Sequence, residues 1–311
     1  MLYLIGKGEG MDNSKVYFTK NITKENLIKI FDALNVELKG KVAVKLSTGE
    51  PGGHNFLDAK LIEPLVNKLN GTIVECCTAY KGRRFEPAEH WKVMEEHGFK
   101  AIAPCDILDE DGDMKLEVVN GKHLKGYNLV GKNIVNYDSM LMLSHFKGHQ
   151  MGGFGGALKN MSIGLASREG KAWIHTWGNT TDLDTFWDFI SNTLNGKQEQ
   201  DYFLESMAEA CESVINYFGK ENIVYINVAN NLSIDCDCSA NPKAPEMADI
   251  GIYASIDPVA LDQCCYDAII NSHDHGKASL VKRMNDRNAI HLVEESARLG
   301  LGVREYEIIE I

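Results

Sequence analysis

The sequence predicts an α/β fold in which a mainly parallel, doubly wound sheet is flanked by helices. Short apolar, β-branched runs alternate along the chain with segments of helical periodicity, a pattern typical of βαβ units. Each run is almost continuously apolar, as expected of strands covered by helices on both faces. Hydrophobic residues make up 44% of the 311 residues, enough for a full core. Because no repeat or Pro/Ser-rich linker divides the chain, we expect a single α/β domain over 1–311.

The expected strands are 41–46, 72–77, 139–144, 222–228 and 249–254, with a last strand over 305–311. The stretch 105–137 differs from this alternation. Its segment 114–119 is predicted as a strand and is followed by Asn120 and Gly121, a pair typical of β-hairpin turns. We therefore expect a small β-hairpin excursion from the parallel core in this stretch.

The expected helices are 157–166, 182–194, 202–218, 257–270 and 288–299. Trp187 and Phe203 belong to apolar stripes with helical spacing, so both are predicted to pack in the core. Truncating either is expected to cost about 3–5 kcal/mol of stability. Asn195 and Gly196 are predicted to end the helix over 182–194.

Net charge, the length of apolar runs and the cysteine pattern exclude some kinds of partner and some cellular compartments. A net charge of −12 argues against a nucleic-acid partner, because phosphate backbones are bound by basic surfaces. No stretch reaches the roughly 18 apolar residues of a membrane span, and residues 1–9 lack the apolar run of a signal peptide. The eight cysteines do not form a secreted disulfide pattern. We therefore expect a cytoplasmic protein without a membrane partner.

Polar residues collect directly after four expected strands, in the segments 47–54, 78–84, 145–160 and 230–238. In open α/β sheets, ligands bind beyond the carboxyl ends of the strands. If the strands are correct, these segments deliver Gly, His, Cys, Lys and Asp side chains to one rim of the sheet.

The third segment, 145–160, is the most informative. Five glycines lie within nine residues, and Lys159 falls in the first turn of the expected helix. A cation there is disfavoured unless an anion or metal-bound group lies nearby. The P-loop and dinucleotide patterns both fail here. We therefore predict a site for a small anionic ligand or a metal cofactor. The expected catalytic residues are His149, Lys159 and His175, and the expected ligand-binding residues are His54, His145, Gly153, Gly155, Gly156 and Asn160.

Two simpler interpretations stay open for this segment. A glycine-rich loop after a strand is sometimes only a tight crossover, and three nearby histidines can be independent hydrogen-bonding groups.

Cys236 and Cys238 form a second candidate site. Thiolates one residue apart can share a soft metal, with further ligands coming from elsewhere in the fold. We expect Cys236, Cys238 and His175 as metal ligands, with Fe, Zn, Ni or an iron–sulfur cluster as the cofactor. The alternative is two half-buried thiols in a loop.

These residues resemble a known family, the one called domain of unknown function 362, whose members are often labelled uncharacterised iron–sulfur centre proteins. The similar motifs are 145–149 with 153–160, 78–80 with 97–99, 235–238, and 249–251 with 257–262. The resemblance implies a metal- or iron–sulfur-associated protein with a possible redox partner. Many members carry an inserted ferredoxin module with repeated C-x-x-C runs. Here the interval 175–235 contains a single cysteine, Cys211, so that module is absent.

A fainter similarity is to the core of nickel-pincer lactate racemases. His149 lies ten residues before Lys159, and His175 lies sixteen residues after it. This resemblance implies that Lys159 tethers a cofactor, His175 ligates nickel and His149 is an acid–base group, with His54 as a candidate second histidine. The alternative function is therefore a racemase- or oxidoreductase-like enzyme that acts on a small hydroxy acid.

Overall fold

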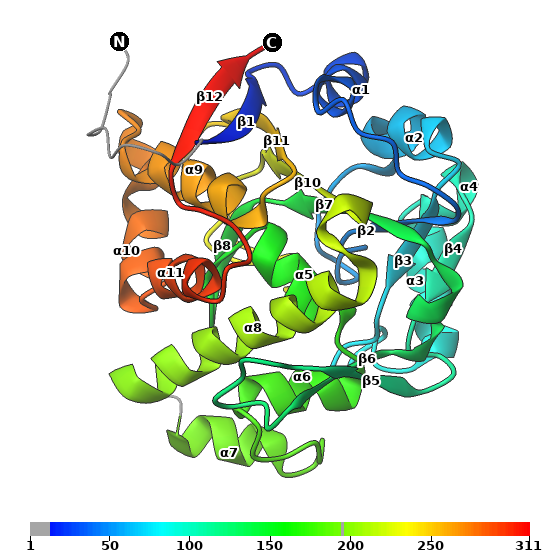
Figure 1. The fold of residues 1–311 in the computed structure, drawn as a ribbon, viewed down its shortest axis with the longest axis vertical. Helices are drawn as coiled ribbons and strands as arrows, with labels where there is room; N and C mark the ends of the chain where they lie inside the picture. Colours follow the sequence, from blue (N-terminus) through cyan, green and yellow to red (C-terminus); the bar gives the residue numbers. More distant parts are fainter. Residues whose placement is uncertain (1–12, 194–195) are drawn as a thin grey trace.

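The computed structural model describes residues 13–193 and 196–311. The expectations for the first nine residues and for the helix end at Leu194 and Asn195 therefore fall outside the described residues. An eight-stranded sheet forms the centre of the molecule (Figure 1). Its strands, in order across the sheet, are β12 (Tyr306–Glu310), β1 (Ser14–Thr19), β11 (Gly251–Ser255), β10 (Ile223–Ala229), β7 (Ser139–His145), β2 (Val42–Lys45), β3 (Thr72–Glu75) and β4 (Cys105–Ile107).

Neighbouring strands of this sheet run parallel except around β11, which is antiparallel to both β1 and β10. The predicted mainly parallel sheet is therefore confirmed. The strands β1 and β4 were not expected from the sequence. β4 has three residues and β1 is only partly buried, so neither presents the continuous apolar run by which a central strand is recognised.

Helices cover both faces of the sheet, so the fold is doubly wound as predicted. Alternate residues of β7 enter two separate apolar clusters, Leu141 and Leu143 in one and Met140 and Met142 in the other, because side chains on a strand alternate between its faces. The first cluster includes α1 (Lys24–Ala33), α2 (Ala59–Lys68), α3 (Pro87–Glu96) and α4 (Phe99–Ile102). The second includes α5 (Ala157–Leu165), α8 (Lys197–Phe218), α9 (Pro258–Ile270), α10 (Ala278–Asp286) and α11 (Ile290–Arg298).

The remaining elements of the described residues are two hairpins, two short α-helices and three 3₁₀ helices. They are α6 (Arg168–His175), α7 (Phe186–Thr193), the hairpin of β8 (Lys147–His149) with β9 (Gly153–Gly155), the hairpin of β5 (Asp113–Glu117) with β6 (Tyr127–Gly131), and short 3₁₀ helices at Lys132–Asn136, Lys220–Asn222 and His275–Lys277. Figure 1 shows α6, α7 and the β5–β6 hairpin grouped beside α8.

The β5–β6 hairpin confirms the predicted excursion, but its turn differs from the predicted one. Asn120 and Gly121 lie inside a longer connection, and the left-handed residues are Lys125 and Gly126. Carboxylates of α8 shape this loop. Glu212 accepts the backbone N–H groups of Val119 and Asn120, and Glu209 accepts those of residues 122–124.

The predicted core position of Trp187 is wrong, whereas that of Phe203 is confirmed. Phe203 is fully buried, but 41% of Trp187 is exposed. On α7 the inward positions are Phe186 and Ile190, so the neighbouring Trp187 points away from the core. We expect Phe203→Ala to lower the free energy of unfolding by about 3–5 kcal/mol and Trp187→Ala by less than about 1 kcal/mol. Equal losses in urea unfolding of the two variants would contradict this assignment.

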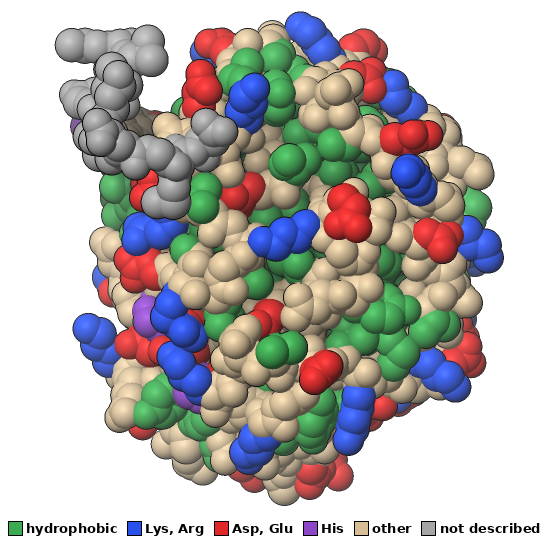
Figure 2. Space-filling view, in the orientation of Figure 1, with side chains coloured by type: hydrophobic (Ala, Val, Ile, Leu, Met, Phe, Trp, Pro, Cys, Tyr) green, Lys and Arg blue, Asp and Glu red, His purple; other side chains and the backbone are tan. Residues whose placement is uncertain are grey.

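Figure 2 shows Lys and Arg side chains scattered among Asp and Glu side chains on one face of the molecule. Among the described residues, no helix combines the length and apolar character that crossing a bilayer requires.

Candidate functional site

A cavity of about 340 Å³ lies at the carboxyl ends of the central strands. Lys45 is the last residue of β2 and Glu75 the last residue of β3, and both line it. Further lining residues come from the β8–β9 hairpin (Lys147, His149, Gln150, Met151), α5 (Lys159, Asn160, Ile163, Gly164), α6 (Lys171, His175), α7 (Phe186, Trp187) and the loop after β10 (Cys236, Asp237, Cys238). This is the place that the strand-end rule indicates for ligands.

Two of the cavity's cations are neutralised by buried carboxylates. Lys147 donates to Asp237 at 2.7 Å, and Arg84 donates to Glu50 at 2.9 Å and to Glu75 at 3.2 Å. Burial alone would raise the pKa of Glu75, but Arg84, His90 and Lys45 together hold that pKa well below its usual range. These ion pairs belong to the wall of the cavity, and within them each of the two cations faces at least one carboxylate.

Three further lysines line the cavity without making an ion pair to any described residue. Lys45 Nζ donates to the carbonyl of Leu46 at 2.7 Å and to Asn160 Oδ1 at 3.1 Å. Lys171 Nζ donates to the carbonyl of Ala166. Lys45 and Lys171 are buried. Both ammonium groups therefore add positive charge to the cavity wall without a direct ion pair to a described residue.

Lys159 differs from the other two, because among the described residues its Nζ has neither a hydrogen-bond partner nor an ion-pair partner. Burial, together with repulsion from Lys147 and Lys45, lowers the pKa of Lys159 to about 7. Burial likewise lowers the pKa of Lys45 to about 8. An unpartnered amine that titrates near neutrality can hold an anion when protonated and act as a nucleophile when neutral.

The two histidines that line the cavity are in opposite tautomers. His149 Nδ1 accepts the backbone N–H of Gly152 at 2.9 Å, so the neutral ring carries its proton on Nε2. His175 Nδ1 faces the carbonyl of Lys171 at 2.7 Å, so it donates there and leaves the Nε2 lone pair free. Both rings are neutral at pH 7, because burial lowers the pKa of His175 to about 4 and that of His149 well below its usual range. His149 is thus a hydrogen-bond donor, whereas His175 can accept a proton or bind a metal.

His145 lies behind the cavity wall rather than on it. Its Nδ1 lies 2.8 Å from Asp237 Oδ1, and its Nε2 lies 2.6 Å from the carbonyl oxygen of Asn230. Asp237 is therefore held between His145 and Lys147. Although burial opposes its ionisation, these two groups lower the pKa of Asp237 below its ordinary range.

The glycines of the 145–160 segment serve packing in this structure, and Gly153, Gly155 and Gly156 do not line the cavity. Gly153 has φ +81°, and a Cβ there would lie 2.4 Å from Ala289 Cβ. A Cβ on Gly156 would lie 2.4 Å from a carboxylate oxygen of Asp262. That carboxylate accepts the N–H groups of Ala157 and Leu158, each at 2.9 Å. The expected anion position at this helix N-terminus is therefore already filled by a side chain of α9.

Asp262 also accepts a hydrogen bond from Asn227 at 2.7 Å, so Asp262→Ala leaves three buried donors unpaired. We expect it to lower the free energy of unfolding by about 3 kcal/mol at pH 4. Burial raises the pKa of Asp262 from 3.8 to about 6, so its contribution is complete below pH 3.8 and decreases as the pH rises through about 6. Urea unfolding of the wild type and of Asp262→Ala at pH 4 and pH 8 measures this. A larger difference in free energy of unfolding at pH 8 than at pH 4 would contradict the prediction.

The expected ligand residues His54 and Asn160 have different positions. His54 is exposed and lies outside the cavity. Asn160 lines the cavity, where its Nδ2 donates to the Lys45 carbonyl at 3.0 Å and to Ser144 at 3.1 Å. Asn160 therefore fixes the end of β2 against α5 and orients the Lys45 ammonium group.

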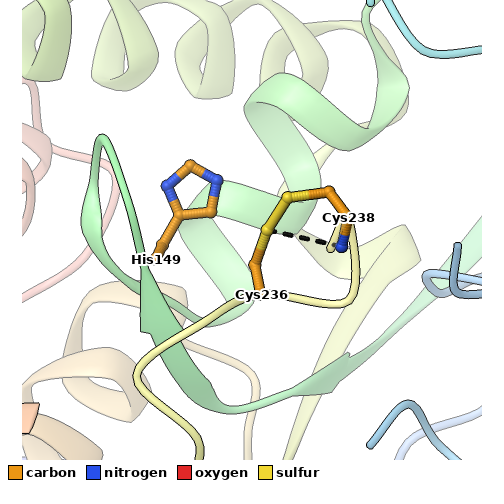
Figure 3. Close-up of side chains that lie close together, drawn as sticks. All are labelled: His149, Cys236 and Cys238. Atoms are coloured by element: carbon orange, nitrogen blue, oxygen red, sulfur yellow. Dashed lines mark hydrogen bonds between the residues drawn. A yellow bond between two sulfur atoms is a disulfide. The ribbon is translucent and has the colours of Figure 1, made fainter. Parts of the chain in front are cut away.

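Cys236 and Cys238 are joined by a disulfide, with their Cα atoms 5.2 Å apart, rather than presenting two free thiolates. Figure 3 shows the ring of His149 beside this pair. One nitrogen of His149 and the two sulfurs lie within 4.8 Å of one another. Cys76, a third cysteine of the cavity, donates its thiol to the Leu165 carbonyl, and burial raises its pKa. As described, these three cysteines offer no thiolate ligand.

Several cavity residues escaped the sequence analysis. They are Lys45, Glu75 and Lys171, whereas Arg84, Lys147 and Asp237 lie in segments predicted to reach the rim but were not named as site residues. Lys45 could have been found from the sequence, because it lies near the end of an otherwise apolar expected strand. A buried strand rarely holds an unpaired charge, so a lysine there indicates a functional position.

Comparison with solved structures gives two similar folds at low identity. The lactate racemase apoprotein from Thermoanaerobacterium thermosaccharolyticum is 15% identical, with a TM-score of 0.46 over 82% of this chain and 57% of that one. A structural-genomics structure of a Thermotoga maritima protein is 11% identical, with a TM-score of 0.45 over 88% and 58%. The chain thus spans less than three fifths of either structure. No curated protein matches it. The family model "Domain of unknown function (DUF362)" matches residues 42–267, and the chain therefore belongs to the DUF362 family.

Proposed function

We propose that this protein binds a small organic anion, of the size of a hydroxy or oxo acid, in the cavity at the carboxyl ends of β2, β3 and β7. The observation that carries this proposal is the amine of Lys159, which has no partner among the described residues, beside Lys45 and Lys171, which form no ion pair with any of them. A buried charge without a counter-ion is costly. A bound carboxylate would supply the missing negative charge and accept the hydrogen bonds that Lys159 does not make.

The same cavity holds the groups that proton-transfer chemistry on such a ligand needs. Protonated Lys159 binds the carboxylate, and His149 Nε2–H is placed to donate a hydrogen bond to a hydroxyl or carbonyl oxygen. His175 Nε2 is the acceptor for a proton. This division between a donor and an acceptor favours an enzyme of the racemase or oxidoreductase type over a simple anion carrier.

Calorimetric titration with lactate and with lactamide tests the binding step, because the two molecules differ mainly in charge. At pH 6 we expect one lactate-sized carboxylate to bind per chain and lactamide to bind at least about tenfold more weakly. Equal binding of the two, or no binding of any small carboxylate or oxo acid, would contradict the proposal.

A second candidate function is metal association, which the free Nε2 lone pair of His175 favours. The tautomer of His175, with Nδ1–H donated to a backbone carbonyl, is the one that metal-binding histidines adopt. A bound transition ion would supply Lewis-acid or redox chemistry beside Lys159. A cubane iron–sulfur cluster, in contrast, does not fit, because it needs four thiolates and the cavity offers a disulfide and one thiol.

Metal analysis of anaerobically purified protein tests this second candidate. We expect any transition metal found to fall to background in His175→Ala and to persist in His54→Ala, since His54 is exposed and lies outside the cavity. Metal-free protein that does not take up added Ni²⁺, Zn²⁺ or Fe²⁺ at micromolar concentration would contradict it.

A further inference from the structure

The groups around Cys236 and Cys238 are arranged for thiol–disulfide exchange rather than for holding a metal. A metal at this trio would need a lone pair on His149 Nε2. That nitrogen carries the proton, because Nδ1 accepts the N–H groups of Gly152 and Met151 at 2.9 and 3.3 Å. In this tautomer Nε2 carries an N–H near the two sulfurs and has no lone pair for a metal.

The two sulfurs are not equivalent. Cys236 is 2% exposed, and its Sγ accepts the backbone N–H of Cys238 at 3.4 Å (Figure 3). Both cysteines line the cavity, but Cys238 is only half-buried. An incoming nucleophile therefore reaches Cys238. Cys236 is the better leaving group, because the hydrogen bond to its sulfur stabilises the thiolate that forms when the disulfide breaks.

The lysines of the cavity set the charge of the nucleophile that would enter. Lys45, Lys159 and Lys171 line the same cavity as the disulfide and make no ion pair with any described residue. Any small molecule that approaches Cys238 through the cavity passes these positive charges. A thiol that bears a carboxylate is therefore favoured over a neutral thiol of the same size.

We propose that Cys236–Cys238 is a redox-active disulfide whose substrates are small thiols bearing a carboxylate, an inference that rests on the proposed anion-binding function of the cavity. The substrate thiolate attacks Cys238 Sγ, the bond between the two cysteines breaks, and Cys236 leaves as a thiolate. A second substrate thiolate then attacks the substrate sulfur of the mixed disulfide and releases Cys238 as a thiolate. Two substrate thiols are thus oxidised to one substrate disulfide, the protein gains two electrons, and the two protons released by the substrate thiols protonate the two cysteines.

The state of the eight cysteines in air-purified protein is the first test. Alkylation after denaturation is expected to modify six cysteines without reductant and all eight after reduction, because the structure has one disulfide and six free cysteines. Eight alkylated cysteines without reductant, or stoichiometric metal held by Cys236 and Cys238, would overturn the proposal.

The rate of reduction by 3-mercaptopropionate, compared with that by 3-mercaptopropionamide, tests the substrate class. With rates expressed per thiolate, we expect the acid to react about tenfold faster than the amide in the wild type. Lys159→Gln should largely abolish this preference. The matched control Lys282→Gln should retain it, because Lys282 is 73% exposed on α10. Equal rates for the two thiols in the wild type would overturn the assignment.

Single-cysteine variants test the order of attack. Incubated with the disulfide of 3-mercaptopropionate, Cys236→Ser is expected to form a mixed disulfide at Cys238, and Cys238→Ser is expected to stay unmodified at Cys236. Peptide mapping separates these sites from Cys105, which is half-buried elsewhere. Modification of Cys236 instead would overturn the order.

Lactate binding by the Cys236→Ser/Cys238→Ser double variant separates this inference from the proposed function. If the wild type fails to exchange while both the wild type and the double variant bind lactate, only the redox inference falls. If lactate does not bind the wild type, the proposed anion-binding function is contradicted, whatever the exchange assay shows.

Discussion

Lys159→Gln is expected to weaken binding of a small carboxylate by about 10- to 100-fold at pH 6, because it removes a charge-assisted hydrogen bond worth roughly 1.5–3 kcal/mol. The fold should be unaffected or more stable, since Lys159 makes no hydrogen bond or ion pair through Nζ to the described residues. Lys282→Gln is the matched control, because it removes an exposed lysine from α10. An unchanged carboxylate affinity in Lys159→Gln would show that the anion binds elsewhere.

Wild-type affinity should also rise as the pH falls from 8 to 6, because the pKa of Lys159 is about 7 and only its protonated form attracts a carboxylate. The other charged and titratable groups of the cavity are Lys45 on β2, Glu75 on β3, Arg84, Lys147 and His149 on β8, Lys171 and His175 on α6, and Asp237. The pKa of His175 is about 4 and that of His149 lies well below its usual range. Neither histidine changes charge in this interval, but Lys45, with a pKa of about 8, also gains charge as the pH falls. The part of the pH dependence that Lys159→Gln removes is therefore the part assigned to Lys159, and a pH dependence that this variant leaves unaltered would contradict the assignment.

Asp237→Asn is expected to be the most destabilising polar substitution in the site, with a loss of about 3–5 kcal/mol. Asp237 is buried between His145 at 2.8 Å and Lys147 at 2.7 Å. The amide would leave the buried Lys147 ammonium group without a counter-ion. Urea unfolding at pH 7 measures this loss.

Asp235→Asn provides the control for that measurement, because the Asp235 carboxylate lies two residues away and accepts an exposed backbone N–H from Lys243. We expect it to change stability by less than about 1 kcal/mol. Comparable losses in the two variants would mean that the 235–238 loop is generally sensitive, and that the Asp237 ion pairs contribute little.

The sequence predicted the fold and the location of the site better than it predicted the partners of each side chain. Apolar runs are sufficient to identify buried parallel strands, and the rule that ligands lie at strand carboxyl ends then located the cavity. Lys45 was missed because it lies within one of those apolar runs. Lys171 was missed because it lies in α6, which was not expected as a helix.

Other features depend on contacts between residues far apart in the chain. Asp262 of α9 caps the N-terminus of α5 from more than 100 residues away, so no local sequence pattern could indicate that the helix was already capped. The tautomers of His149 and His175 follow from which backbone groups their Nδ1 atoms meet. Trp187 and Phe186 are neighbours in the sequence, and only the docking of α7 decides which of the two is buried.

Borohydride trapping with glyoxylate tests the central claim most directly, namely that the cavity offers an accessible, anion-attracting amine on Lys159. At pH 7 a lysine with a pKa of about 7 forms an imine with the aldehyde of glyoxylate, and reduction makes the bond permanent. We expect one carboxymethyl group per chain, mapped to Lys159 and suppressed by excess lactate. Modification spread over exposed lysines, with Lys159 unmodified, would contradict the account.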